Sequence, residues 1–351
     1  MNFAERRLKS LNVTIIGLTI VLILVLLLPF TVKIVEENLE PFLFLMGLAA
    51  AFISQVLDRS LFFKALEDPI HITLAVLIAG LLFRWLQTPI EKGILGLSRA
   101  IPSRLFIAFV VIILGLVSSI ITAIIAALVL VVIVSVLRLD RQSEIRLVVL
   151  ACFSIGLGSA LTPLGEPLST IATSKLGEDF FFLMRLIGSD VIPAVLIFGI
   201  LAAVLVKPRK DQSGLSSSLE VESYGEIIIR AIKIYLFVMG LTLLGAGFEP
   251  FIEKYLLGVS PLLLYWINMI SAVLDNATLA AAEISPLMEA PTIKAILLGL
   301  MISGGMLIPG NIPNIISAGK LNITSREWAR FGVPVGLAAM IVYFIVILIF
   351  G

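Results

Sequence analysis

The sequence of 351 residues contains one cysteine, Cys152, and one histidine, His71. A disulfide framework and a metal site built from cysteine and histidine are therefore both excluded. Charged residues make up only 14% of the chain and the net charge is +1, which gives no basic surface for nucleic acid. No Gly-Lys-Ser/Thr phosphate loop occurs, which argues against an ATP-driven pump, and no feature predicts an enzyme.

The chain has long apolar runs instead. Hydrophobic residues account for 60% of the sequence, and the mean hydropathy is +1.13. A soluble domain of this length carries more charge, whereas a membrane-spanning helix needs about 20 mostly apolar residues. We therefore predict an all-α, polytopic membrane protein whose main partner is the lipid bilayer, in the plasma (cell inner) membrane.

One apolar run, Gly156–Leu176, is interrupted in its middle by the sequence LTPLGEP. Pro163 and Pro167 each remove a backbone donor, and Gly165 tolerates dihedral angles that other residues avoid, so a helix should open here. In lipid, an open backbone is stable only where it is buried in protein or lines a watery cavity. Side-chain oxygens cluster at this break, on Thr162, Glu166 and Ser169. The segment thus predicts a broken membrane helix with a small-ion site.

The pattern returns in Ser303–Leu321, SGGMLIPGNIPNIISAGKL. Aligning Gly165 with Gly310 places Glu166 on Asn311, with Asn314 one turn further on. Interrupted helices at corresponding positions in two halves of a chain point to a transporter binding site. Two independent Pro-Gly kinks are the alternative, but kinks alone do not explain polar residues at both breaks.

Two apolar runs of ambiguous length, Leu105–Leu137 and Ser260–Met288, precede the breaks. Each is long for one crossing of a ~30 Å hydrocarbon core and short for two crossings with a turn. We predict a re-entrant helical hairpin for each run. The polar residues expected at the two tips are Ser118 and Thr122 in the first hairpin, and Asp275, Asn276 and Thr278 in the second. The segment from Ser118 aligns with the segment from Ser271.

These features divide the chain into four parts: scaffold helices in 1–104, a first repeat in 105–206, a linker in 207–226 and a second repeat in 227–351. A basic stretch, Arg84–Arg104, is expected to lie along the membrane surface. Basic residues in the linker and in Arg138–Arg146 place both in the cytoplasm by the positive-inside rule. The two hairpins then enter from opposite sides, which predicts an inverted repeat.

Asp275 has no basic neighbour in sequence, and an aspartate near the centre of a membrane helix costs about 2.5 to 3.5 kcal/mol. Its partner must be a proton, a cation or a distant residue. Two carboxylates with amide oxygens describe a hard-cation site, so Glu166, Asp275 and Asn276 are candidate Na⁺ ligands that protons would compete for. Alternatively, Asp275 and Asn276 form a turn, and Glu166 is protonated and hydrogen-bonded.

Four further charged residues, Asp190, Glu283, Lys175 and Lys320, receive structural interpretations. Asp190 follows Gly188-Ser189 ahead of an apolar run and is expected to cap a helix. Glu283 and the lysines at helix ends are expected to snorkel to the interface or to pair in loops.

The order of hairpin, helix broken at GSALTPLGEP, second hairpin with SAVLDNAT, and second broken helix resembles the ion transporter superfamily. That superfamily includes NhaD-type sodium/proton antiporters, arsenite permease-like proteins and dicarboxylate carriers. The resemblance covers about 105–351. The SAVLDNAT stretch is also similar to an uncharacterised prokaryotic family within the superfamily. It implies a homodimer with a scaffold and a moving transport domain.

The sequence therefore predicts a secondary active transporter that exchanges Na⁺ or Li⁺ for H⁺, with no cofactor besides the transported ions. One alternative is a sodium-coupled or proton-coupled carrier of a dicarboxylate or an oxyanion. A second alternative is a channel or another membrane protein that does not exchange ions.

Overall fold

The computed structural model describes residues 3–137, 139–207, 223–255, 259–273, 276–284 and 288–350. Within these ranges the chain forms helices and no strand. Four described helices are long and apolar enough to cross a membrane, over Ser103–Ile121, Phe182–Leu205, Tyr224–Glu249 and Ser325–Ile349. The all-helical fold is thus confirmed, and its apolar helices indicate a membrane protein.

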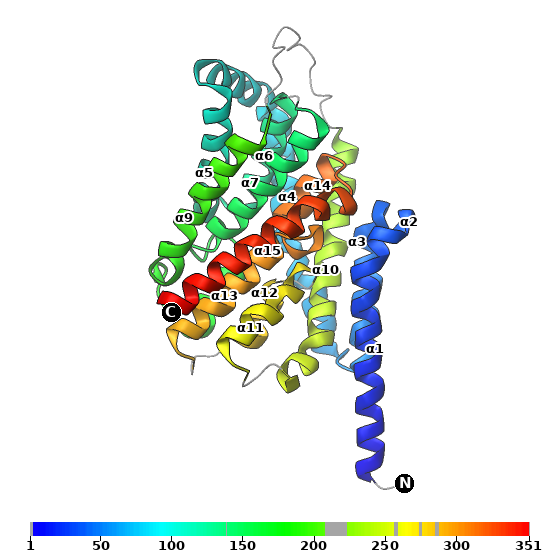
Figure 1. The fold of residues 1–351 in the computed structure, drawn as a ribbon. Helices are drawn as coiled ribbons and strands as arrows, with labels where there is room; N and C mark the ends of the chain where they lie inside the picture. The colour runs from blue at the N-terminus through cyan, green and yellow to red at the C-terminus, as the bar shows by residue number, and fades with distance from the viewer. Residues whose placement is uncertain are drawn as a thin grey trace.

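A scaffold forms one side of the molecule. Its helices are α1 (Phe3–Thr31), α2 (Lys33–Glu37), α3 (Leu39–Ile53), α4 (Arg59–Ala100) and α10 (Tyr224–Tyr255). Helix α10 packs along α3 and α4, and α1 packs on α3 (Figure 1). Gly240 permits the close approach of α10 to α3, because a Cβ atom there would lie 2.7 Å from the backbone of Phe44.

The predicted surface stretch Arg84–Arg104 is largely continuous with the helix before it, and its position relative to a membrane stays a prediction. Helix α4 runs for 42 residues without interruption and includes most of it. At 1.5 Å per residue the helix is about 63 Å long. It ends just before Pro102, which disfavours helical geometry in the residue preceding it.

The first set of inner helices follows α4. It comprises α5 (Ser103–Ile121), α6 (Ala123–Leu137), α7 (Arg141–Ser159), α8 (Pro167–Leu176) and α9 (Phe182–Leu205). Helices α5, α7 and α9 pack on one another. A single residue, Thr122, separates α5 from α6, and its φ of 75° interrupts the helix at the predicted tip. Helix α5 alone is long enough to cross a membrane, so length alone does not distinguish a re-entrant arm from a span.

The second set follows α10. It comprises α11 (Pro261–Ile267), the 3₁₀ helix η1 (Asn268–Ala272), α12 (Asn276–Glu283), α13 (Ala290–Gly304), the 3₁₀ helix η2 (Ile308–Gly310), α14 (Ile312–Lys320) and α15 (Ser325–Phe350). Both predicted broken helices are therefore interrupted, the first between α7 and α8 and the second between α13 and α14.

The packing of the two sets corresponds in several pairs of elements. Helix α7 contacts α5 and α9, as α13 contacts α11 and α15. Helix α6 packs on the preceding scaffold helix α4 and on α14. In the same way, α12 packs on the preceding scaffold helix α10 and on α8. Helices α6 and α12 thus each touch a scaffold helix and the short half-helix of the other set.

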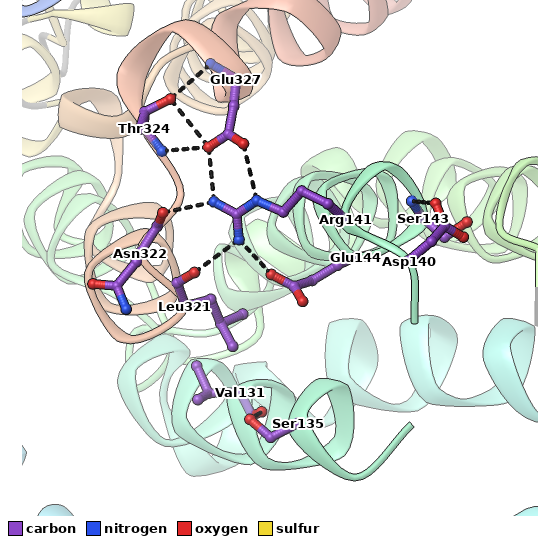
Figure 2. Close-up of polar contacts among 10 residues, drawn as sticks. All are labelled: Val131, Ser135, Asp140, Arg141, Ser143, Glu144, Leu321, Asn322, Thr324 and Glu327. Atoms are coloured by element: carbon purple, nitrogen blue, oxygen red, sulfur yellow. Dashed lines mark hydrogen bonds and ion pairs between the residues drawn. The ribbon is translucent and has the colours of Figure 1, made fainter. Parts of the chain in front are cut away.

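Arg141, the first residue of α7, joins the two sets at one end of the molecule (Figure 2). Its guanidinium donates to both carboxylate oxygens of Glu327, at 2.9 and 2.7 Å, and to the carbonyl oxygens of Leu321 and Asn322. At the same end, Arg146 donates to the carbonyl of Leu205 at 3.1 Å. The start of α7, the end of α9 and the α14–α15 connection therefore lie together.

A cavity where both breaks meet both tips

The central feature is a cavity of about 770 Å³. Its wall contains a residue from each of the four predicted elements: Thr122 from the first tip, Glu166 from the first break, Asn276 from the second tip and Asn311 from the second break. Residues separated by up to 189 positions in sequence thus face one space, since Thr122 and Asn311 lie that far apart (311 − 122 = 189). One residue from each predicted break and tip therefore lines the cavity.

Glu166 and Asn311 hold equivalent backbone positions. Each is the N-cap of a short half-helix, with φ/ψ of −155°/161° at Glu166 and −154°/145° at Asn311. A proline follows within two residues in both, at Pro167 and Pro313, where a missing N–H costs nothing because the first turn has no intrahelical acceptor for it. The side chains are 7% and 8% exposed, so both groups are buried at the cavity wall.

The two breaks are compact because glycines permit close backbone approach. A Cβ atom at Gly165 would lie 1.9 Å from the carbonyl oxygen of Ser159, and one at Gly310 would lie 2.5 Å from that of Gly304. Those two contacts correspond in the alignment that pairs Glu166 with Asn311. Each break therefore folds back on the end of its own helix in the same way.

Hydrogen bonds tie the first tip to the first break. The backbone N–H of Ala123 donates to the carbonyl of Gly165 at 3.0 Å, and the Thr162 hydroxyl donates to the carbonyl of Ser119. The Ser118 hydroxyl donates to the carbonyl of Ile155 at 3.1 Å. Ser118 and Thr162, predicted as ligands, thus have backbone partners, and neither lines the cavity.

Two other predicted ligands also bond to backbone. Ser169 donates to the carbonyl of Glu166 at 2.7 Å. Asn314 donates from Nδ2 to the carbonyls of Gly304 and Leu307, at 2.9 Å each, and so closes the second break. Asp275 and the side chain of Thr278 lie outside the described parts of the chain, although Asn276, next to Asp275, lines the cavity.

The scaffold adds charged residues that sequence reasoning missed. Lys64 and Asp68 of α4 and Glu249 of α10 line the cavity opposite the breaks. The i, i+4 spacing of Lys64 and Asp68 on one face of a helix, just before an apolar run, was the available signal. Within the described residues, no group of three His, Cys, Asp or Glu side chains is close enough to hold a metal ion, so a cation here would also need amide and carbonyl oxygens.

Two charged residues differ from their predicted roles. Asp190 is not a helix cap: α9 begins at Phe182, so Asp190 lies inside the helix and pairs with Lys294 of α13 at 2.8 Å. Glu283 neither snorkels nor pairs in a loop, because it is buried and accepts a hydrogen bond from Asn268 at 3.0 Å. The predicted roles were wrong because the partners, Lys294 for Asp190 and Asn268 for Glu283, lie elsewhere in the chain. Lys175 and Lys320 do lie in the last turns of their helices.

The fold and the cavity indicate a helical membrane protein in which polar and charged side chains line part of a mainly apolar cavity between two broken helices and the scaffold helices. The chain belongs to the family described as "Protein of unknown function (DUF1646)", whose profile matches residues 15–350. No curated protein matches the sequence.

Proposed function

We propose that the protein is a secondary active transporter that exchanges Na⁺ or Li⁺ for H⁺ across the plasma membrane. The observation that carries the proposal is the meeting of Thr122, Glu166, Asn276 and Asn311 at one cavity. A buried carboxylate flanked by amide and hydroxyl oxygens suits a small hard cation. Asp275 would add a second carboxylate beside Asn276.

An inverted repeat supports this proposal, with α4–α9 as one copy and α10–α15 as the other. Three observations agree with it: the corresponding packing pairs, the matching N-cap dihedrals, and equivalent hydrogen bonds of Ser118 to Ile155 and of Ser271 to Leu300. Inverted repeats with broken helices are a recurrent design of secondary transporters. The superfamily resemblance further implies a homodimer in which the inner helices move against the scaffold.

The charges around the cavity favour a cation. Three carboxyl groups, those of Asp68, Glu166 and Glu249, face it, against the one ammonium group of Lys64 in the lining. These carboxylates would repel an anion that enters the cavity. A cation and a proton, by contrast, compete for the same oxygens, because a protonated carboxyl no longer offsets the loss of the ion's hydration shell. Competition at one site is sufficient for exchange.

The test is proton movement in proteoliposomes that carry a pH gradient. Addition of Na⁺ or Li⁺ should dissipate the gradient for the wild-type protein. Glu166→Gln should abolish this response, because an amide keeps the shape but neither carries a proton nor neutralises a cation. Glu178→Gln is the matched control, since Glu178 is an exposed residue after α8, and it should behave like the wild type. Wild-type exchange rates in Glu166→Gln would remove Glu166 from the site.

One observation favours an anion carrier as the second candidate. Lys64 lines the cavity, and the N-terminal ends of α8 and α14, where partial positive charge accumulates, border it. In the same proteoliposomes, a gradient that responds to a dicarboxylate or an oxyanion, and to Na⁺ only in its presence, would support this candidate over the antiporter.

A further inference from the structure

Glu283 is a buried acid that the cavity does not use. It is the last residue of α12, is 2% exposed and is absent from the cavity lining. Its carboxylate oxygen Oε2 accepts a hydrogen bond from Nδ2 of Asn268, which lies in η1 and is fully buried. These two side chains bridge the two arms of the second hairpin.

The bridge leaves two oxygens without partners. Among the described residues, Oε1 of Glu283 and Oδ1 of Asn268 are both buried and neither has a hydrogen-bond partner. Buried polar atoms are nearly always satisfied, so this pair requires an explanation. Both atoms are acceptors when Glu283 is ionised, and no rotation of either group can then satisfy them together.

No cation offsets a charge on Glu283 in the described structure. Helix α12 packs on α8, α10, α13 and η1. Lys294 of α13 pairs with Asp190 at 2.8 Å, and Lys233 of α10 approaches Glu40 at 3.8 Å. Lys175 lies in the last turn of α8, and Glu249 of α10 adds another negative group rather than a cation. One neutral hydrogen bond does not compensate for burying a carboxylate.

We infer that Glu283 is a proton-binding site, separate from the cavity, and that it carries a proton on Oε1 in the conformation described here. That proton is donated to Oδ1 of Asn268, while Nδ2 of Asn268 donates to Oε2. The acid and the amide then form a closed ring of two hydrogen bonds, and a single proton satisfies both remaining oxygens. A metal ion would need more oxygens than these two.

The site belongs to the second hairpin alone. In the register that aligns Ser118 with Ser271, Gly115 corresponds to Asn268 and Leu130 corresponds to Glu283. The first hairpin therefore forms without an acid or an amide at these positions, and the pair is not a requirement of the fold. If the protein exchanges cations for protons, as proposed above, Glu283 gives the second hairpin a proton of its own.

Infrared spectroscopy of the purified protein tests this inference without any transport measurement. A protonated, buried carboxyl has a C=O stretch that is well separated from the bands of ionised carboxylates. At neutral pH the difference spectrum between the wild type and Glu283→Gln should show the loss of one such band. The glutamine variant should fold normally, because its amide can both accept from and donate to Asn268. Glu289→Gln, which changes an exposed carboxyl, is the matched control and should retain the band.

Asn268→Ala provides the second arm. It removes the acceptor but leaves the carboxyl, so the band should shift in position rather than disappear. A difference spectrum between the wild type and Glu283→Gln that shows no lost band would overturn the inference. The band reports protonation alone. If the band is present but the protein moves no Na⁺, the antiporter proposal fails and the inference about the proton site stands.

Discussion

Glu166 and Asn311 share one backbone geometry but differ in charge. Both cap a half-helix at the same cavity with φ values one degree apart, −155° and −154°. One side chain can hold a proton or a negative charge, and the other is a neutral amide. The site is therefore symmetric in its backbone and asymmetric in its chemistry.

The glycines of the breaks give the first prediction. Gly165→Ala places a methyl group 1.9 Å from the Ser159 carbonyl oxygen, and Gly310→Ala places one 2.5 Å from that of Gly304. Both substitutions should lower the free energy of unfolding by about 1 to 3 kcal/mol or more, because backbone must move. Gly319→Ala, which meets nothing within 4 Å, is the control in α14 and should be tolerated. Thermal unfolding in detergent measures all three, and equal melting temperatures for Gly165→Ala and Gly319→Ala would contradict the break geometry.

A second prediction concerns the equivalent serines. Ser118 and Ser271 each donate at 3.1 Å to a carbonyl on the facing helix, Ile155 and Leu300 respectively. Replacing either with alanine leaves a buried carbonyl short of a donor and should cost about 1 kcal/mol. Ser135→Ala should cost less, since Ser135 bonds only to Val131 in its own helix. Unequal losses for the two buried serines, measured by denaturation, would argue against equivalence.

Asp140 yields a prediction about pH. It caps α7, and hydrogen bonds from the Ser143 side chain and the Ser143 backbone N–H hold the pKa of Asp140 below its ordinary value. A carboxyl whose pKa is lower in the folded state stabilises the fold above its unfolded pKa, and this contribution is lost as pH falls through the folded pKa. Asp140→Ala should cost about 1 kcal/mol at neutral pH.

The Asp140→Asn variant separates the cap from the charge. Asparagine caps a helix as well as aspartate does but does not titrate. Its stability at neutral pH should be close to that of the wild type, and the acid-dependent loss assigned to Asp140 should disappear. A wild-type and an Asn variant with the same acid dependence would show that other groups are responsible.

Membrane sidedness gives a fourth prediction. In a background lacking Cys152, single cysteines at Gln142 and Arg326 should react with an impermeant reagent from one side, because Arg141 joins the two segments. Cysteines at Glu178 and Glu289, after α8 and before α13, should react from the other side, since each broken helix crosses the membrane in the proposed inverted repeat. Labelling of all four positions from one side would refute that arrangement.

The breaks could be predicted because their causes are local. Proline removes a donor wherever it occurs, and the Pro-Gly-polar pattern at Gly165 and Gly310 specifies an opened helix regardless of its neighbours. The tip at Thr122 followed from run length alone. Glu166, Asn276 and Asn311, which were singled out from these patterns, all line the cavity.

The roles of the other polar residues depend on contacts between distant segments, which a single sequence does not encode locally. Ser118 and Thr162 looked like ligands because they are polar in an apolar run, yet backbone carbonyls satisfy them. The role of Asp190 depends on its ion pair with Lys294, and the role of Glu283 depends on its hydrogen bond with Asn268. The scaffold carboxyl of Asp68 was missed because its helix approaches the breaks only in the folded molecule.

The most direct test of the central claim, that Na⁺ and H⁺ share the carboxylate of the cavity, is a thermal-shift titration with Na⁺ over a series of pH values. The account predicts that Na⁺ raises the melting temperature and that more Na⁺ is needed for the same shift as the pH falls. It also predicts no Na⁺-dependent shift in Glu166→Gln at any pH. A stabilisation by Na⁺ that grew on acidification, or that appeared only with a dicarboxylate present, would contradict the claim.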